Sequence, residues 1–145
     1  MGSRKHNTAL ALKEARKNVA SAKLNNCPTS PRKMRLVADM IRGMEVTKAL
    51  YSLKNNGKEA SIRLEKLLVS ALSNWETKNE GVSMDEKELI VQTISVDSGR
   101  MLKRVQPAPQ GRAHRVRKRS NHVTIVIGES NTKENSSITE VKEVQ

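Results

Sequence analysis

Phenylalanine is absent from this sequence of 145 residues, which has a single tryptophan, a single tyrosine and a single cysteine. Since aromatic side chains are scarce, a domain of this length must build its one modest core from aliphatic residues. One cysteine excludes an internal disulfide, and the reducing cytoplasm is therefore the expected location. Residues 1–7 lead into a mixed polar stretch unlike a signal peptide, and no apolar run is long enough to span a bilayer.

Acidic residues are absent from residue 98 to residue 122, although this stretch has eight lysines and arginines. The net charge of the sequence is +12, and residues 1–35 and 98–128 each have +8, whereas residues 36–97 and 129–145 each have −2. A solvated surface usually mixes both signs, so it explains this pattern less well. A membrane surface also attracts cations, but no basic amphipathic helix with bulky aromatic anchors is present. Two basic segments on a near-neutral body predict a nucleic-acid-binding protein.

The acid-free stretch lies between two runs rich in β-branched residues, Leu89–Val96 and Val123–Ile127, which can pair across a sheet. The stretch itself has too few apolar residues to pack on a core of its own. At about 3.3 Å per residue, Ser98–Pro107 alone can extend roughly 30 Å. We therefore expect a long hairpin, about residues 97–123, that leaves the body and is held extended by a polyanion. Prolines limit hydrogen bonding at the apex and Gly111 tolerates a left-handed turn, which predicts a stiff open loop there.

Helical periodicity dominates the segment before residue 80. A helix of about twelve residues should begin at Pro31, with Ser30 as its N-cap, and stop at Gly43. Two further helical stripes follow it. The predicted buried faces of the three helices are Met34, Val37, Ala38 and Ile41, then Val46, Ala49, Leu50 and Leu53, then Ala60, Leu64, Leu67, Leu68, Ala71, Leu72 and Trp75. A tryptophan at such a position is more often part of the core than a platform for stacking bases.

The two ends of the chain show no helical stripe of bulky residues. Residues 15–24 alternate small or apolar residues with polar ones, which favours a strand. Residues 1–14 are predicted to be a basic flexible arm that orders on a partner, and residues 130–145 a disordered polar tail. Residues 15–129 are then expected to form a single domain.

Three cations, Arg32, Lys33 and Arg35, lie in the first turn of the predicted helix. Cations there oppose the helix dipole, which favours anions at this end. The arrangement suits a phosphate that is held by free first-turn amides together with the basic side chains. A first turn that is simply solvated is the open alternative.

Residues that could form a catalytic or metal site are few and scattered. The soft metal ligands are His6, His114, His122 and Cys27, and no two of them have metal-binding spacing. No glycine-rich phosphate loop follows a strand, and no nucleophile is paired with a histidine in a recognisable frame. We therefore expect no enzyme activity, no metal, no cofactor and no small-molecule substrate. His114 and His122 lie among arginines and lysines, where a phosphate or a base is the expected neighbour.

Four sequence runs resemble a known family. Ser30–Gly43 resembles the first helix of the bacterial-type ribosomal protein L22 (uL22) family, and Gly99–Arg104, Gly111–Arg115 and Lys118–Ile125 resemble its hairpin. The resemblance covers about residues 14–129. It implies an α+β fold in which three helices pack on a small three-stranded antiparallel sheet with a long protruding β-hairpin.

The resemblance also implies a function. A member of this family is a structural constituent of the large ribosomal subunit in the cytoplasm, binds the large-subunit (23S-type) rRNA and aids its assembly. Its expected partners are that rRNA, neighbouring large-subunit proteins, and the nascent polypeptide, which meets the hairpin tip in the exit tunnel. A free nucleic-acid-binding regulator and a transient ribosome assembly factor are the alternatives, and neither is expected at one copy per mature subunit.

Basic side chains are expected to contact phosphates and so position the protein without reading base sequence. The predicted rRNA-binding residues are Arg16, Lys17, Arg32, Lys33, Arg35, Arg100, Lys103, Arg104, Arg112, His114, Arg115, Arg117, Lys118, Arg119 and His122. The predicted exit-tunnel tip is Met101, Leu102, Lys103, Arg104, Val105, Gln106, Pro107, Ala108, Pro109, Gln110, Gly111 and Arg112.

Overall fold

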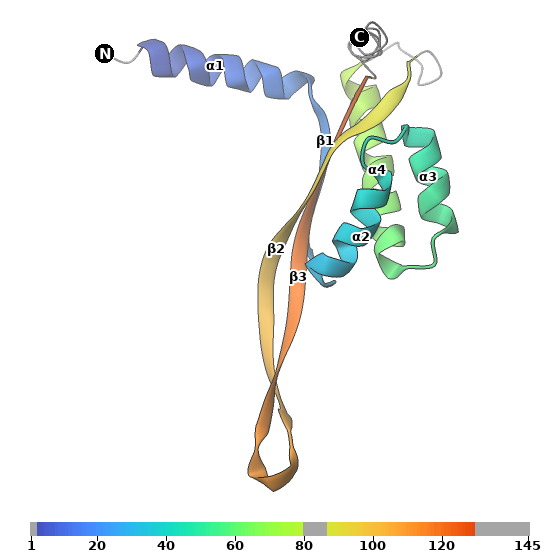
Figure 1. Cartoon of the computed structure of the whole chain (residues 1–145). Helices are drawn as coiled ribbons and strands as arrows, with labels where there is room; N and C mark the ends of the chain where they lie inside the picture. The colour runs from blue at the N-terminus through green and yellow to red at the C-terminus, as the bar shows by residue number, and fades with distance from the viewer. Residues whose placement is uncertain (1–2, 80–86, 130–145) are drawn as a thin grey trace, which may run out of the picture.

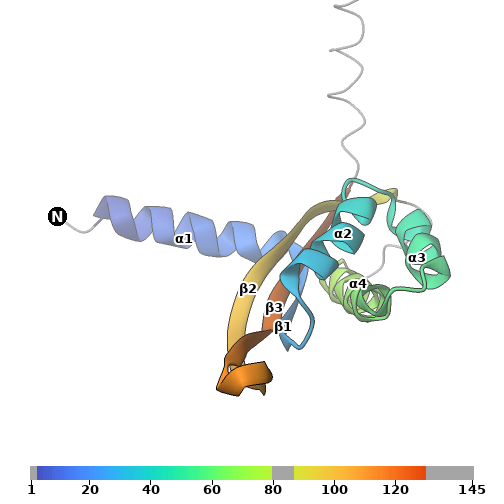
Figure 2. The same ribbon diagram turned by 60° about the horizontal axis from the view of Figure 1, so that its bottom comes forward.

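A three-stranded antiparallel sheet in the order β1-β3-β2 forms the centre of the computed structural model (Figure 1), which describes residues 3–79 and 87–129. The strands are β1 (Ala20–Cys27), β2 (Leu89–Pro107) and β3 (Ala113–Glu129). The helices α2 (Pro31–Ile41), α3 (Val46–Asn55) and α4 (Glu59–Lys78) lie on one side of the sheet, and α1 (Ser3–Asn18) points away from them (Figure 2). The predicted α+β fold, with three helices on a small sheet and a long hairpin, is confirmed.

The core between helices and sheet is aliphatic, as the absence of phenylalanine requires. Every residue of the predicted helical stripes is buried except Leu50, which is half-buried against the core. Trp75 is 4% exposed, so the only tryptophan is a core residue and is not available for base stacking. The sheet contributes alternate residues, among them Val123, Ile125 and Ile127 of β3. Periodicity alone therefore identified the packed face of each helix correctly.

Helix α2 begins at Pro31 as predicted, but its capping differs. The backbone carbonyl of Ser30 accepts hydrogen bonds from the amides of Lys33 (3.0 Å) and Met34 (3.1 Å), whereas the Ser30 hydroxyl makes no capping bond. The helix ends at Ile41. Gly43 follows with φ +70°, and its amide donates to the Val91 carbonyl at 2.9 Å, which ties the end of the helix to β2.

The hairpin is paired from Leu89 opposite Glu129 to Pro107 opposite Ala113. Its apex is closed, so the prediction of an open loop is wrong. The Ala108 amide donates to the Arg112 carbonyl at 2.9 Å, around a turn in which Gln110 (φ 61°) and Gly111 (φ 70°) are left-handed. A residue other than glycine in the left-handed region allows the chain to reverse within five residues despite its two prolines.

The N-terminal segment is helical where a flexible arm and the first part of a strand were expected. Helix α1 includes residues 15–18, and β1 starts only at Ala20. The mixture of small and polar residues is compatible with the period of a helix and with that of a strand. The good helix formers before Val19 favour the helix. The side chains of residues 15–18, the predicted tail at 130–145 and residues 80–86 lie outside the described part of the chain.

Candidate nucleic-acid interface

One face of β3 changes from aliphatic to basic as the strand leaves the body. Residues 123, 125 and 127 point toward the helices and are buried valine and isoleucine. Continuing outward at the same spacing of two, the next residues on this face are buried Asn121 and then exposed Arg119, Arg117 and Arg115. The strand face that packs against helices inside the body therefore continues, beyond the body, as a row of three exposed arginines, which we call the arginine ladder.

Strand β2 completes this face with the residues opposite the ladder. Met101 pairs with Arg119, Lys103 with Arg117, and Val105 with Arg115. We call the side chains of these six residues the helix-side face of the hairpin. Four of the six are cationic and exposed, and the other two are apolar.

Helix α2 meets this face at the root of the hairpin. A cleft of about 480 Å³ lies between them, lined by Ser30, Pro31, Arg32, Arg35, Ser98, Arg117 and Arg119. None of these lining residues is acidic, and four are arginines that come from segments more than 80 residues apart. We call this the basic cleft. It brings together two groups of predicted rRNA-binding residues that the sequence could not place relative to one another.

Arg35 has a structural contact as well as a place in the basic cleft. Its Nη2 donates to the Val96 carbonyl at 3.1 Å, so this arginine joins α2 to β2. Two turns later, just after the end of α2, Arg42 Nη2 donates in the same way to the Ile94 carbonyl at 3.2 Å. The guanidinium has several donors, so the bond to Val96 leaves Arg35 others for a phosphate.

The first turn of α2 offers a phosphate fewer free amides than expected, and Pro31 has none. The amides of Lys33 and Met34 both bond to the Ser30 carbonyl. Any anion here would be held chiefly by side chains. Lys33 itself lines a different hollow, beside Leu36 and Lys58, and is not part of the basic cleft.

Asn121 holds the two walls of the cleft together, and sequence reasoning missed it. This side chain is fully buried, and its Nδ2 donates to the carbonyl (2.7 Å) and the Oγ1 (2.8 Å) of Thr29. Thr29 precedes Ser30, so these bonds fix the start of α2 against β3. The one available signal was a polar residue in register with the buried face of β3.

A bulge beside Asn121 redirects the hairpin. The pairing shifts by one residue between Ser98 and Met101, and the Ser120 hydroxyl donates to the carbonyl of Arg100 there. A Cβ on Gly99 would lie 2.7 Å from the Ser120 Oγ, so any larger residue at this position would force Ser120 to move. Arg100, one of the predicted contacts, is thus presented from a bulge and not from a regular strand position.

The other predicted hairpin residues lie on the opposite face or at the turn. Arg104, His114 and Lys118 are exposed on the face away from the helices, and Arg112 follows the apex. His122 is half-buried, and its Nδ1 accepts a hydrogen bond from the Asn26 amide at 3.0 Å, which gives this histidine a structural role. The hairpin is therefore basic on both faces. Arg16 and Lys17 lie in α1, and their side chains are outside the described part of the chain.

The hairpin cations have no acidic partner among residues 3–79 and 87–129. The ion pairs in these ranges join Arg42 to Asp39, Lys48 to Glu45, Arg63 to Glu59, and Lys87 to Glu129, all away from residues 98–122. Like charges on neighbouring strand positions repel one another, and a polyanion would relieve that repulsion.

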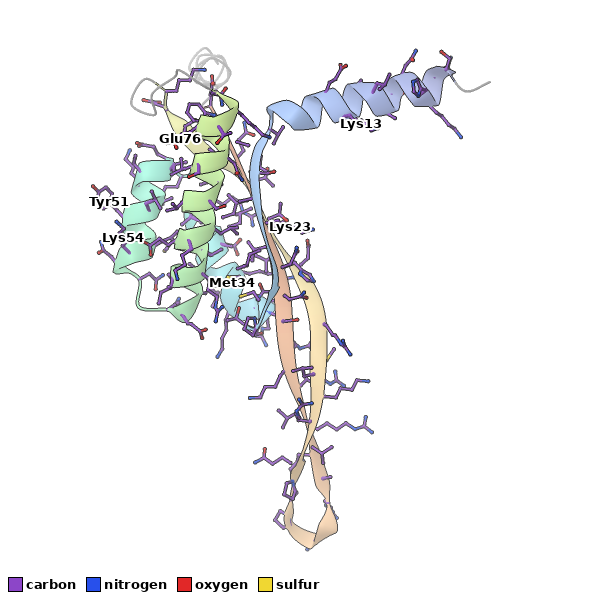
Figure 3. The ribbon with its side chains drawn as sticks, turned by 180° about the vertical axis from the view of Figure 1, so that it is seen from behind. Lys13, Lys23, Met34, Tyr51, Lys54 and Glu76 are labelled. Carbon is purple, nitrogen blue, oxygen red and sulfur yellow. The ribbon has the colours of Figure 1, made fainter. Side chains whose placement is uncertain are left out.

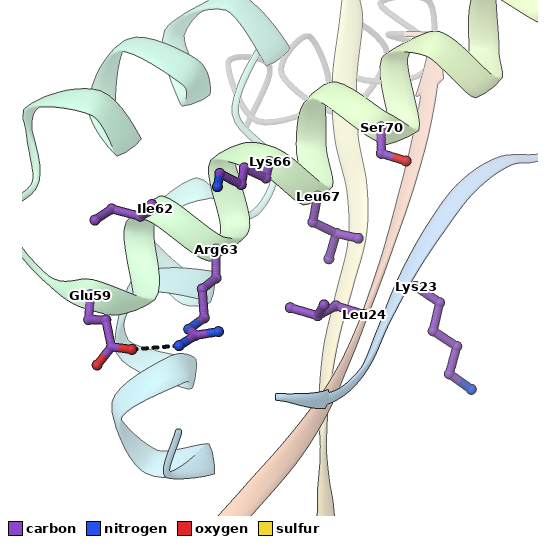
Figure 4. Close-up of a pocket in the computed structure, with 8 residues that line it drawn as sticks. All are labelled: Lys23, Leu24, Glu59, Ile62, Arg63, Lys66, Leu67 and Ser70. Carbon is purple, nitrogen blue, oxygen red and sulfur yellow. Dashed lines mark hydrogen bonds and ion pairs between the residues drawn. The ribbon is translucent and has the colours of Figure 1, made fainter. Parts of the chain in front are cut away.

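A second hollow, of about 550 Å³, lies between β1 and α4 and has a different character (Figure 4). Leu24, Ile62 and Leu67 supply apolar walls. Arg63 Nη2 donates to the Glu59 carboxylate at 2.7 Å, and this bond raises the pKa of the guanidinium. Its cation is thus already paired within the protein, although Lys23 and Lys66 also line this hollow.

Neither a metal centre nor a membrane span appears in the described ranges. Within them, no three histidine, cysteine, aspartate or glutamate side chains gather closely enough to hold a metal ion. No helix in the same ranges has the length and apolarity needed to cross a bilayer.

Comparison with known proteins gives a family match over most of the chain. The model of the family "Ribosomal protein L22p/L17e" matches residues 22–128. A protein of Christiangramia forsetii is 66% identical over 131 residues, which cover 90% of this chain and 97% of that protein. A protein of Flavobacterium johnsoniae is 62% identical over 94% of this chain and 100% of its own length. One of Porphyromonas gingivalis is 62% identical over 93% of this chain and 100% of its own. All three are named large ribosomal subunit protein uL22.

Proposed function

The chain belongs to the L22p/L17e family of ribosomal proteins, and from this premise we propose that its hairpin and basic cleft bind the rRNA of the large subunit. As a uL22 protein it is a component of that subunit in the cytoplasmic ribosome, and its family is one of structural proteins rather than enzymes. In more detail, we propose that the protein binds 23S-type rRNA and aids the assembly of that rRNA. We also propose that the tip of its hairpin lines the peptide exit tunnel.

The observation that carries the proposal is the change of character along the helix-side face. Arginines occupy the positions at which β3, inside the body, has buried valine and isoleucine. Such a face cannot pack on protein helices, but planar guanidinium groups match phosphate oxygens in charge and geometry. Binding several phosphates would release counterions from the RNA, which is the main source of affinity.

The basic cleft gives this binding a defined starting point. Arg32 and Arg35 on one wall face Arg117 and Arg119 on the other, across a space of about 480 Å³. A phosphodiester backbone that enters the cleft would meet cations on two sides. Because Asn121 fixes the walls before RNA arrives, little conformational entropy is lost on binding.

Beyond the cleft, the hairpin depends on its surroundings. The paired segment Met101–Pro107 extends about 20 Å from the bulge at 3.3 Å per residue. An isolated two-stranded ribbon is marginally stable in water, and this one has cations on both faces. We propose that it threads between rRNA segments, which would neutralise both faces at once.

The apex differs chemically from the shaft of the hairpin. Val105–Gly111 has no charged residue, and Val105 is 70% exposed. A neutral, tightly closed turn offers neither strong attraction nor repulsion to a passing polypeptide of any sequence. We propose that this apex, at the end of the predicted tip, forms part of the tunnel wall beside the nascent chain.

The test is the copy number of this protein per purified large subunit, by quantitative mass spectrometry, before and after a wash at about 1 M salt. Screening then acts over roughly 3 Å, so a protein held by exposed ion pairs would be lost, whereas a threaded hairpin is retained. We expect one copy to survive. A triple variant, Arg115→Glu, Arg117→Glu and Arg119→Glu, should fail to incorporate stably.

The matched control reverses three exposed charges on the body, with Lys54→Glu, Lys58→Glu and Lys66→Glu. It changes the net charge equally, so it should incorporate like the parent if position matters more than total charge. Retention of the hairpin triple variant through the wash would refute the assignment of the ladder. Far less than one copy of the parent protein would instead indicate an assembly factor or a free regulator.

A further inference from the structure

Helix α1 stands clear of the rest of the protein. In Figures 1 and 2 it extends from the start of β1 in the direction away from α2, α3 and α4. All its described side chains, residues 3–14, are exposed, including Leu10 (43%) and Leu12 (55%), and Figure 3 shows Lys13 directed into open space. Its base is held by Lys78, whose Nζ donates to the Val19 carbonyl at 2.7 Å.

A helix of this length needs a partner to be stable. Sixteen residues span about 24 Å at 1.5 Å per residue, and isolated helices this short are marginal in water. In globular proteins, packing of one face supplies the missing stability. The described side chains of α1, residues 3–14, are all exposed and supply no such packing, so we expect stabilising contacts from another molecule.

The apolar residues of α1 do not form a docking stripe. Ala9, Leu10, Ala11 and Leu12 are consecutive, so at 100° per residue they are spread around most of the helix, and the one other apolar residue, Ala15, is too small to serve as an anchor. A helix that binds a protein groove has apolar anchors three and four residues apart on one side. A helix that binds a membrane surface needs a broad apolar face with bulky anchors. Neither pattern is present.

The charges of α1, by contrast, form a consistent pattern. Arg4, Lys5, Lys13, Arg16 and Lys17 give it five cations against one acid, Glu14. The two clusters of cations are separated by about 12 Å along the axis, at 1.5 Å per residue. Cations at both ends of a helix with a neutral middle suit phosphates on the two sides of a groove in duplex RNA.

The family comparison separates α1 from the hairpin. The match to the family begins at residue 22, within β1, so α1 lies outside the region shared with the family model. Whatever α1 binds is therefore additional to the contacts of the region that the family model matches.

We infer that α1 is a second RNA-binding element. It becomes stably helical by lying across the phosphates of an rRNA duplex, beside the end of the sheet that is opposite the hairpin tip (Figure 1). This inference rests on the proposed function, because it requires the protein to reside in the large subunit. It does not depend on the contacts of the hairpin, and the two can be tested separately.

The experiment replaces Leu12 by a photo-crosslinking amino acid in the full chain, and purifies large subunits that contain it. After irradiation, we expect the crosslinked product to be rRNA. A second protein has the same probe and five substitutions, Arg4→Gln, Lys5→Gln, Lys13→Gln, Arg16→Gln and Lys17→Gln. Glutamine preserves helix propensity but not charge, so the rRNA crosslink should fall about tenfold or more.

The outcomes distinguish this inference from the proposed function. Crosslinks to a ribosomal protein, or an rRNA crosslink that is unchanged by the five glutamines, would overturn the role of α1 even when one copy per subunit is present. If the five-glutamine protein fails to incorporate, the parent's crosslink still decides the identity of the partner. Absence of the parent protein from the subunit would refute the proposed function itself.

Discussion

Replacing Asn121 by alanine should loosen the basic cleft without unfolding the body. The substitution removes two hydrogen bonds to Thr29, of 2.7 and 2.8 Å, from a site with no exposed surface. Each such bond contributes about 1 kcal/mol net. The Asn121 Oδ1 has no hydrogen-bond partner in the described part of the chain, so no third bond is lost. Adding a small cavity, we expect a loss of about 2–3 kcal/mol.

Urea denaturation followed by the fluorescence of Trp75 measures this loss. With a slope of about 1–3 kcal/mol per M for a small domain, the midpoint should fall by roughly 1–2 M. Trp75 is the only tryptophan and is buried in the core, so its emission reports unfolding of the body. Asn55→Ala, at an exposed position on α3, is the matched control and should change stability by less than about 0.5 kcal/mol.

A second substitution at the same position tests the effect of charge. Asn121→Asp keeps the shape of the side chain but points a carboxylate at the Thr29 carbonyl in a buried site. Burial favours the protonated acid, so the folded-state pKa of the new carboxyl would lie above its unfolded value of about 3.9. Relative to the parent at the same pH, the variant should thus be least impaired below that value and lose stability as the pH rises toward 7.

Asn121 should also affect RNA binding. Under conditions in which both proteins are folded, Asn121→Ala should bind a large-subunit rRNA fragment more weakly than the parent, because the walls of the cleft are no longer fixed. Two results would show that Asn121 does not fix the walls of the cleft. Asn121→Ala could be as stable as Asn55→Ala, or it could lose stability and still bind RNA as tightly as the parent.

Two other predictions concern the bulge and the third helix. Gly99→Ala should lower the free energy of unfolding by about 1–3 kcal/mol, because the new Cβ would lie 2.7 Å from the Ser120 Oγ. Adding Ser120→Ala should restore part of that loss in a double-mutant cycle. Gly57→Ala is the neutral control, because no atom lies within 4 Å of its new Cβ. At the start of α3, hydrogen bonding to Lys48 holds the pKa of Glu45 below its usual value of 4.5. The stabilisation by this pair is therefore present above pH 4.5 and is lost as the pH falls through the folded-state pKa. NMR titration of the Glu45 carboxyl should show this midpoint, Lys48→Met should raise it, and an unchanged midpoint in that variant would contradict the ion pair.

Local patterns predicted the parts of the fold that depend on neighbours in sequence. The spacing of Met34, Val37, Ala38 and Ile41 identifies the packed face of α2 because a helix brings residues three and four apart together. The hairpin was predictable for a similar reason, since β-branched runs flanked a turn sequence. Each of these signals is contained in a window of a few residues.

What the sequence did not predict depends on distant pairs or on weak local preferences. The bonds from Asn121 to Thr29 join residues 92 positions apart, and no local pattern pairs them. The closed apex depends on the left-handed conformation of Gln110, which is uncommon for such a residue. Helix α1 was not predicted because it has helix-forming residues but no apolar stripe, and the other helices were identified by such stripes.

The three unpredicted features have a common physical setting, because each lies where the protein stops supplying its own packing. On β3, the body ends at Asn121: on one side of it the sheet faces α2 and the residues are aliphatic, and on the other they are arginines. The distance from α2 therefore decides which chemistry the same strand face can have. Helix α1 shows the same rule near the other end of the chain, since it leaves the sheet, has five cations against one acid, and exposes all of its described side chains, residues 3–14. A protein built in this way completes its folding on a polyanion. The stability of the body and the affinity for RNA should therefore be coupled at Asn121 and Arg35, which both join elements of the body beside the cleft, and be largely independent at other positions.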